Sequence, residues 1–403
     1  MNVIDLFAGA GGLSEGFRQE NFNILAHVEM DKNACNTLRT REAYYYLKEN
    51  NELDLYKKYL LKEIKREDFY RKIPDEILDK VIESEISDET LNNIFDKIDK
   101  LIGNEEVNLI IGGPPCQSFS PAGIARDPNR MLFDPRNYLY LYYIEFLKRY
   151  RPNFFVFENV KGIITAKKGE IFKDLVLNLD KAGYKLDYKI LNSKDFGVAQ
   201  SRERVFIIGW KKEINFEYPV FSANLKSPTI NELFRDLPKL KAGETINGKG
   251  KYISNISING VKSKDWDILT YHIARPHNEN DLEIYKKVVE KWNKEKKTLK
   301  YNELPERLKT HNNNKCFLDR YKMVRGDTQS HTVVAHISKD GHYYIHPDIE
   351  QNRSLSVREA ARIQSFPDNF YFESSRTAAF QQIGNAVPPL MAKKIAKKLK
   401  EAF

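Results

Sequence analysis

Short apolar runs alternate with amphipathic stretches along the first half of the chain. Runs rich in β-branched or aromatic residues predict strands at residues 3–7, 24–28, 107–111, 154–157 and 205–208. Helical spacing lies between them, at residues 13–20, 138–150 and 171–182. This alternation predicts an α/β fold with a doubly wound, mainly parallel sheet and helices on both faces. Ligands of such a sheet bind beyond the carboxyl ends of its strands.

Two regions depart from this alternation. Residues 41–105 are dense in charged residues and tyrosine and have helical spacing, which predicts a helical insertion ahead of the strand at 107–111. Residues 216–375 hold prolines, asparagines and short mixed segments, with one basic, helix-like run at 285–300. We therefore predict a catalytic domain made of residues 1–215 plus 376–403, and a second, smaller domain of irregular β and loop structure over 216–375.

Composition narrows the class of protein. The chain has 403 residues, 41% hydrophobic and 30% charged, so it is long enough for two domains with real cores. No apolar stretch approaches the ~20 residues that span a bilayer, and the first strand leaves no room for a signal peptide. Three scattered cysteines suggest neither a disulfide framework nor a zinc site. We expect a cytoplasmic protein with no membrane partner.

The net charge is +9, from 65 Lys and Arg against 56 Asp and Glu. A lysine-rich solvated surface would explain this excess. A polyanionic partner would explain it too, because Lys and Arg gain affinity by releasing counterions from phosphates. Charge alone leaves both interpretations open.

A cysteine and a glutamate stand at the ends of two predicted strands. Cys116 follows Gly-Gly-Pro-Pro directly after residues 107–111, and Glu158 follows residues 154–157. Neighbouring parallel strands would bring this thiol and this carboxylate to one edge of the sheet. A nucleophile beside an acid suits addition to an electron-poor ring. The alternatives are a buried structural thiol and an ordinary salt-bridge carboxylate.

A glycine-rich turn, Phe7-Ala-Gly9-Ala-Gly11-Gly, closes the first strand. Glycines there permit a tight turn and close approach of a ligand. The spacing differs from the Gly-x-Gly-x-x-Gly of NAD-dependent oxidoreductases, which argues against that class. Glu29 ends the second strand and can accept the hydroxyls of a ribose, and Met30 can stack on an adenine. The alternative is a surface glutamate and a buried methionine.

Two arginines precede the last predicted strand of the first half, in Gln200-x-Arg202-x-Arg204. Alternation places all three side chains on one face, where arginine suits a phosphate or a base carbonyl. A surface ion-pair cluster is the alternative. Four histidines are irregularly spaced, so we predict no metal site: His331, His336, His342 and His346.

Together these motifs resemble, in the same order, those of cytosine-C5 DNA methyltransferases of the bacterial restriction–modification kind. The resemblance continues in Arg-Ser-Leu-Ser-Val-Arg-Glu-Ala-Ala-Arg-Ile-Gln-Ser-Phe-Pro at residues 353–367 and in Gln-Ile-Gly-Asn-Ala-Val-Pro at residues 382–388. Single motifs are soft, but six in the order of the family, over nearly the whole length, are very specific.

The resemblance implies the methyltransferase fold and a reaction on a cytosine flipped out of double-stranded DNA. Cys116 would add to C6 of the base and Glu158 would support this step at N3. Arg204 would bind the base carbonyl, with Arg202 in support. Residues 117–136 would form a mobile loop that closes over the base. The cofactor, S-adenosylmethionine, would be bound by Phe7, Gly9, Gly11, Glu29, Met30, Pro115, Leu139, Asn385 and Val387.

It also implies that residues 216–375 read the DNA target, with Thr332, His336 and Lys339 as candidate contacts. The enzyme would be a monomer that needs no metal and is paired in function with a restriction endonuclease. The Asp-Ile pair with which the family contacts the adenine has its nearest matches in Glu85-Ile86 or in Asp88.

Two rival functions keep the same fold. One is a C5 methyltransferase that acts on tRNA, but a folded RNA loop needs no separate duplex-reading domain such as the long region 211–350. The other is a sequence-specific DNA-binding repressor without activity. The intact Cys116, Glu158 and Arg204 argue against the repressor.

Overall fold

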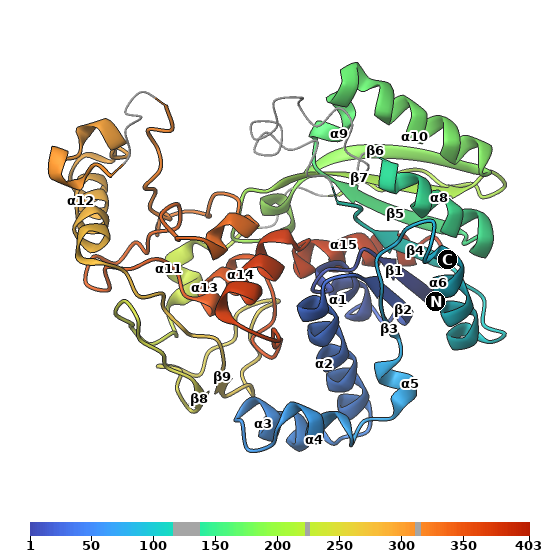
Figure 1. Ribbon diagram of the computed structural model, residues 1–403, viewed down its shortest axis with the longest axis horizontal. Helices are drawn as coiled ribbons and strands as arrows, with labels where there is room; N and C mark the ends of the chain where they lie inside the picture. Colours follow the sequence, from blue (N-terminus) through green and yellow to red (C-terminus); the bar gives the residue numbers. More distant parts are fainter. Residues whose placement is uncertain (116–137, 222–225, 311–315) are drawn as a thin grey trace.

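The computed structural model describes residues 1–115, 138–221, 226–310 and 316–403 (Figure 1). Cys116 and the predicted loop at 117–136 lie outside these residues. A seven-stranded sheet has the order β3-β2-β1-β4-β5-β7-β6. The strands are β1 (Asn2–Leu6), β2 (Asn23–Glu29), β3 (Val81–Glu83), β4 (Leu109–Gly112), β5 (Phe154–Asn159), β6 (Tyr184–Asn192) and β7 (Glu203–Lys211).

All neighbouring strands from β3 to β5 are parallel, and β7 runs antiparallel to both β5 and β6. The predicted α/β fold with a mainly parallel sheet is therefore confirmed. Side chains alternate between the two faces, so that Val3 packs on one side of β1 and Ile4 on the other. Each face thus carries an apolar core of its own.

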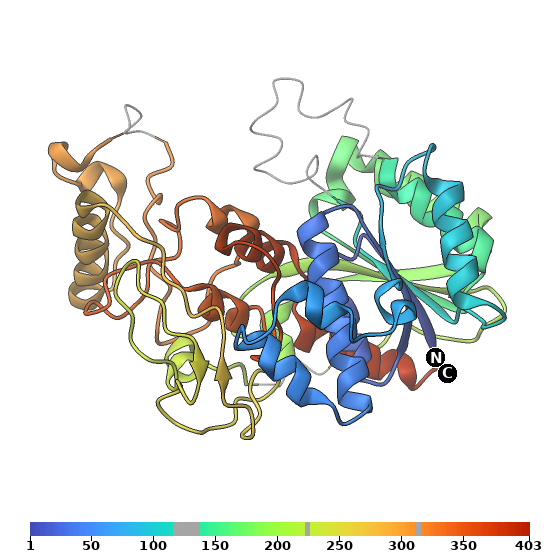
Figure 2. The ribbon, with the colours of Figure 1, turned by 60° about the horizontal axis from the view of Figure 1, so that its bottom comes forward.

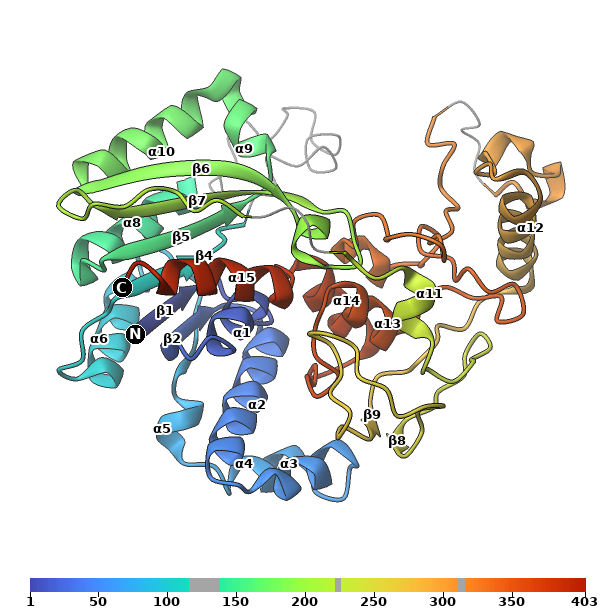
Figure 3. The ribbon, with the colours of Figure 1, turned by 180° about the vertical axis from the view of Figure 1, so that it is seen from behind.

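Helices cover both faces of the sheet (Figures 1 and 3). On one face, α1 (Gly12–Arg18) packs against α15 (Pro389–Lys400). Gly12 and Gly16 allow this approach, because a Cβ on Gly12 would lie 2.2 Å from the carbonyl oxygen of Val387. On the opposite face lie α6 (Leu91–Ile102), α8 (Leu139–Tyr150) and α10 (Glu170–Lys181).

The segment 41–105 is not the purely helical insertion that the sequence pattern predicted. It contains α3 (Leu53–Leu60), α4 (Arg66–Tyr70) and α5 (Asp75–Leu78), but also β3, which pairs with β2. Its first residues belong to α2 (Lys32–Glu49). Three strand residues are too few to show a two-residue period, so the pattern could not separate β3 from the helices around it. The pattern also missed β6, a half-exposed strand at the other edge.

A smaller lobe lies beside the sheet, and both chain ends meet on the far side of the sheet lobe (Figure 2). Its helices are α11 (Ile230–Phe234), α12 (Glu279–Glu295), α13 (Val357–Ile363) and α14 (Arg376–Asn385). Its only regular strands in the described chain are β8 (Gly248–Lys249) and β9 (Ile268–Leu269). This matches the predicted irregular domain, although α12 begins earlier than the basic run at 285–300. Phe380 of α14 packs in the core of this lobe, and the domain limits stay a prediction.

Buried ion pairs surround α13, inside the motif at residues 353–367. Arg362 donates to Asp236 (2.6 Å) and to Asp368 (2.6 Å), and all three side chains are fully buried. Arg353 forms two 2.7 Å bonds with Glu359, one from each terminal nitrogen. These arginines therefore hold the smaller lobe together.

Candidate active site

The carboxyl ends of β4 and β5 form the centre of the site. Gly112 pairs with Phe157 in the parallel register, so Gly113 lies beside Glu158. A Cβ on Gly113 would come within 2.8 Å of the Glu158 Oε2 atom. The Asn159 Nδ2 atom donates to the carbonyl oxygen of Pro114 (3.2 Å) and fixes the loop that leads toward the predicted nucleophile. Glycine is thus required at 113 for the carboxylate to keep its place.

Glu158 is paired with Arg204 from the antiparallel neighbour β7. The Arg204 Nε atom lies 3.1 Å from the Glu158 Oε1 atom, and the two side chains are only 17% and 13% exposed. A carboxylate and a guanidinium are thus held together at the strand ends. This arrangement can hydrogen-bond the edge of a ring that presents both donors and acceptors.

The other two residues of the Gln-x-Arg-x-Arg motif have different partners. Arg202 is buried, and its Nη1 atom donates to the carbonyl oxygens of Val333 (2.9 Å) and Gly384 (3.2 Å). Gln200 accepts from the Val333 backbone NH (2.6 Å). Strand alternation does not extend to these positions, because β7 begins at Glu203. Arg202 therefore joins the smaller lobe and α14 to the start of β7, and its predicted catalytic role stays a prediction.

The turn between β1 and α1 has the backbone expected of a ligand-binding loop. Phe7, Gly9 and Gly11 all have positive φ, at 54°, 55° and 78°. For Phe7 this is a strained conformation of the kind that collects at functional sites. A Cβ on Gly9 would meet nothing within 4 Å, so its outer side is open.

Glu29, at the end of β2, is fixed against this turn. Its Oε2 atom accepts from the Gly9 NH (2.8 Å), and its Oε1 atom accepts from the NH groups of Met30 (2.9 Å) and Asp31 (2.8 Å). Burial raises the pKa of Glu29, and the three NH groups oppose that rise. Met30 follows with its side chain 60% exposed. An anchored carboxylate, an open glycine turn and an exposed thioether fit the ribose and adenine of S-adenosylmethionine.

The remaining predicted cofactor residues come from three other segments. Val387 touches the first turn of α1 through its carbonyl oxygen, near Gly12. Asn385 ends α14 and is exposed. Pro115, just before the undescribed residues 116–137, and Leu139, just after them, are half-buried. Their part in binding stays a prediction.

The end of β3 clarifies the choice between Glu85-Ile86 and Asp88. Glu83 pairs with Glu29, and the Ser84 NH donates to the carbonyl oxygen of Glu29 (2.9 Å). Ile86 therefore follows at the same sheet edge as the cofactor turn. Asp88 accepts instead from the Tyr142 hydroxyl (2.9 Å). Sequence reasoning missed the strand that gives Ile86 this place; only the motif order could have indicated it.

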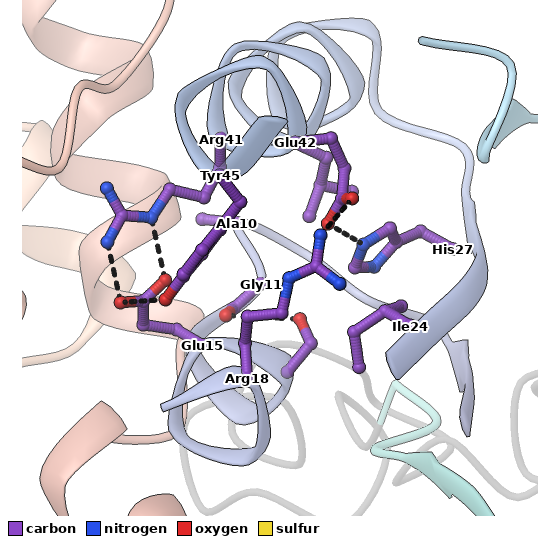
Figure 4. A pocket seen from close by; sticks show the side chains of 11 residues that line it. Ala10, Gly11, Glu15, Arg18, Ile24, His27, Arg41, Glu42 and Tyr45 are labelled. Carbon is purple, nitrogen blue, oxygen red and sulfur yellow. Dashed lines mark hydrogen bonds and ion pairs between the residues drawn. The ribbon is translucent and has the colours of Figure 1, made fainter. Parts of the chain in front are cut away.

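A buried charge network that the sequence did not reveal lies behind the cofactor turn (Figure 4). The Arg41 guanidinium donates twice to Glu15, both at 2.7 Å, and Glu42 accepts from Arg18 at 2.8 Å. His27 lies 3.3 Å from Glu42, and from Asp5 of β1 at the same distance. The pocket that these residues line has a volume of about 10 Å³, which is too small for a cofactor. The network instead ties β1, β2, α1 and α2 together beneath the turn.

His27 is the titratable centre of this network. Burial alone would lower the pKa of His27, but its hydrogen bonds with Asp5 and Glu42 outweigh burial and raise it above the ordinary value. His27 thus links Asp5, near the carboxyl end of β1, to Glu42 of α2. The cofactor turn is therefore built on a rigid, charged support.

The candidate DNA contacts lie where α14 meets the smaller lobe. The Thr332 hydroxyl donates to the carbonyl oxygen of Ser201 (2.7 Å), while His336 and Lys339 are exposed. His331 bonds to the carbonyl oxygen of Tyr343 and His342 to the Tyr285 hydroxyl, both at 2.7 Å. Among the residues that the structure describes, no group of three His, Cys, Asp or Glu could hold a metal ion. No helix in the described ranges has the length and apolarity needed to cross a membrane.

Solved structures with similar folds cover this chain completely. A DNA modification methyltransferase encoded within an E. coli prophage is 23% identical, with a TM-score of 0.64 over 99% of that chain. The S. pombe Dnmt2 methyltransferase is 16% identical, with a TM-score of 0.53 over 99% of that chain. At these identities the likeness shows the fold alone.

Sequence comparisons show the family. Residues 1–70 and 65–401 match the family model of C-5 cytosine-specific DNA methylases. The chain is 43% identical to the type II methyltransferase M.Bpa9945I of Bacillus paralicheniformis, covering all of this chain and 99% of that protein. It is 31% identical to the type II methyltransferase M1.HphI of Haemophilus parahaemolyticus, covering 98% and 86%. The chain therefore belongs to the C-5 cytosine-specific DNA methylases, which makes it a DNA (cytosine-5-)-methyltransferase with S-adenosylmethionine as methyl donor.

Proposed function

We propose that the chain methylates one cytosine within a short recognition sequence of duplex DNA and so protects that sequence from a restriction endonuclease of the same specificity. The type II methyltransferase from B. paralicheniformis, 43% identical over its length, supports the link to restriction. The enzyme acts as a monomer. The observation that carries the proposal is the Glu158–Arg204 pair beside Gly113, at the strand end from which the Pro-Pro-Cys segment leaves β4.

In this proposal Cys116 attacks the base. Its thiolate forms a bond with C6 of the cytosine, which makes C5 enamine-like and able to attack a methyl group. The added electron density falls on N3 and the carbonyl oxygen of the ring. Glu158 hydrogen-bonds N3 and the exocyclic amine, and Arg204 hydrogen-bonds the carbonyl oxygen. The 3.1 Å contact between the two side chains keeps both aimed at one edge of the base.

The methyl donor supplies an electrophilic methyl group on a sulfonium sulfur. Glu29 accepts the ribose hydroxyls, Met30 lies against the adenine, and Gly9 leaves room for the donor at the turn. Ile86 adds an apolar contact from the end of β3. Once C5 carries the methyl group, loss of the C5 proton and release of the Cys116 sulfur from C6 restore the aromatic ring.

Duplex DNA lies between the two lobes, with the target cytosine flipped out of the helix. Residues 216–375 read the recognition sequence, and residues 117–136 close over the base. Arg202 acts as a positioning residue, since its bonds to Val333 and Gly384 tie the smaller lobe to β7. It thereby keeps Arg204, two residues later, at the edge of the sheet.

Bisulfite sequencing of DNA from cells that express the chain tests this function. We expect methylation at one cytosine of a single short motif, its complete loss in Cys116→Ala and its retention in Cys316→Ala. Cys316 is an exposed cysteine in the smaller lobe and serves as the matched control. Methylation that survives Cys116→Ala would refute the assigned nucleophile. Absence of methylation from folded wild-type protein would refute the function.

A further inference from the structure

One phenylalanine of the smaller lobe is largely exposed. Phe317 is 75% exposed, and its φ of 54° lies in the left-handed region. Bulky side chains rarely adopt this conformation, and strained residues of this kind persist only where the surroundings enforce them. Neither packing nor backbone preference explains a phenylalanine at this position.

Hydrogen bonds from Arg320 and Tyr301 fix the backbone of the segment around Phe317. The Arg320 Nε and Nη2 atoms donate to the carbonyl oxygens of Phe317 and Cys316, both at 3.1 Å. The Arg320 guanidinium also lies 4.1 Å from the centre of the Tyr301 ring. The Tyr301 NH donates to the carbonyl oxygen of Leu318 (2.7 Å), which joins this segment to the chain that leaves α12. The aromatic ring is therefore presented on a fixed support.

The chain between α12 and Tyr301 is rich in lysine. Lys296, Lys297 and Lys300 come just before Tyr301, and all three are exposed. None forms an ion pair within the described part of the chain, whereas Lys291, one turn earlier, is paired with Glu303 at 2.7 Å. We call Lys296, Lys297, Lys300, Phe317 and Arg320 the Phe317 rim.

Phe317 and Arg320 belong to the chain segment that follows residue 315. Along the long axis of the molecule, the segment that follows residue 315 lies between α12 and the sheet lobe in both views (Figures 1 and 3). α12 packs against this segment in one apolar cluster that includes Tyr285, Tyr301 and Tyr321. A polymer lying between the lobes would pass this segment before it reached α12.

We propose that the Phe317 rim is a DNA-binding surface on which Phe317 makes an apolar contact with a base of the recognition sequence or its flank. This inference rests on the proposed function, because it requires duplex DNA between the lobes. Exposed lysines bind phosphates through counterion release, and an aromatic ring can contact a thymine methyl group or a partly unstacked base. Exposed lysines near an exposed ring favour a polyanion over an apolar protein partner.

The test compares Phe317→Ala and Phe317→Gly with Ile253→Ala in the full chain, on a duplex that carries the mapped motif. Ile253 is 66% exposed in the same lobe and serves as control. For both Phe317 variants we expect kcat/KM to fall about tenfold, through KM for DNA. Both Phe317 variants should bind S-adenosylmethionine as the wild type does. The Ile253→Ala control should have wild-type kcat/KM. Phe317→Gly also relieves the backbone strain, so its thermal midpoint does not fall.

The second readout is sequence preference. The experiment measures methylation of a duplex library in which each base is varied in turn. If Phe317 contacts a base of the recognition sequence, Phe317→Ala should discriminate less at one position. If Phe317 contacts the flank, Phe317→Ala should bind all sequences more weakly to the same extent. Wild-type kinetics and preference in both variants would overturn the inference. A wild-type chain that methylates no DNA would instead refute the proposed function, so the two failures are distinguishable.

Discussion

The interior of the sheet lobe between β1 and β5 differs in chemistry from the interior of the smaller lobe around α13. Between β1 and β5 the interior consists of side chains such as Ile4, Ile110 and Val156, all with no exposed surface. Around α13 the interior contains Arg362, Asp236 and Asp368, equally buried and bonded to one another. The first core is non-directional, whereas the second depends on hydrogen bonds made by every charged group.

This difference determines which substitutions lower the stability of each lobe. An apolar core tolerates volume-conserving changes, which cost less than about 1.5 kcal/mol. A buried ion pair contributes little net stability compared with an apolar pair, but losing one partner leaves the other charge buried and unpaired. The stability of the smaller lobe is therefore sensitive to the loss of a single charged residue around α13.

Arg362→Met is expected to have the largest effect on stability. It removes the 2.6 Å partner of Asp236 and Asp368, which keep only the longer ion pairs with Lys262 (3.9 Å) and Arg358 (3.7 Å). The free energy of unfolding should fall by about 3–5 kcal/mol. Urea denaturation followed by circular dichroism measures this change. The control is Arg307→Met, which removes an exposed arginine paired with Glu283 and should leave the free energy of unfolding close to that of the wild type. Equal stability of the two variants would show that the buried network is dispensable.

Two glutamate-to-glutamine changes separate activity from stability. In Glu158→Gln we expect kcat to fall by about 10²-fold or more, because an amide cannot deliver a proton to N3. Its unfolding free energy should remain within about 1 kcal/mol of wild type. Glu359→Gln should do the reverse, losing stability because Arg353 loses a charged partner held by two 2.7 Å bonds. Steady-state methylation and denaturation of both variants check this, and a stability loss in Glu158→Gln alone would contradict the comparison.

The pH dependence of stability should differ between the lobes. Burial lowers the pKa of His346 in the smaller lobe to about 4, from an ordinary value of 6.5. The unfolded chain therefore binds a proton that the folded chain does not, and stability should fall by about 1–3 kcal/mol as the pH drops from 6.5 to 4. In the sheet lobe the folded pKa of His27 is raised, so its contribution is present below pH 6.5 and is lost as the pH rises past its folded pKa.

Unfolding curves of His346→Gln and His27→Gln between pH 4 and 9 measure these contributions. The first variant should flatten the acid side of the wild-type profile, and the second should flatten the neutral-to-alkaline side. If both variants changed the same side, the opposite shifts assigned to the two histidines would be wrong.

The local pattern of apolar residues was enough to predict most strands of the sheet lobe. β1, β2, β4, β5 and β7 were predicted because each carries an apolar run long enough to show its character. β3 and β6 were missed: one has three residues, and the other is an edge strand with alternating exposure over only part of its length. The motif order identified the family, and the comparisons confirmed it.

The candidate site shows the same division. Glu158, Arg204, Glu29 and the glycine turn were named from the sequence, and the structure joins them in two pairs: Glu158 with Arg204, and Glu29 with Gly9. The place of Ile86 depended on β3. The separate partners of Arg202 and Arg204 depended on where β7 begins.

The sequence by itself determined the fold class, the family and the chemistry-bearing residue types, because periodicity and motif order are properties of neighbouring positions. Tertiary structure alone decided the rest. Arg362 meets Asp236 across 126 positions of the chain, and His27 bridges Asp5 and Glu42 from separate elements. No local pattern encodes such pairings, because buried charges find partners only when the chain folds and water is excluded.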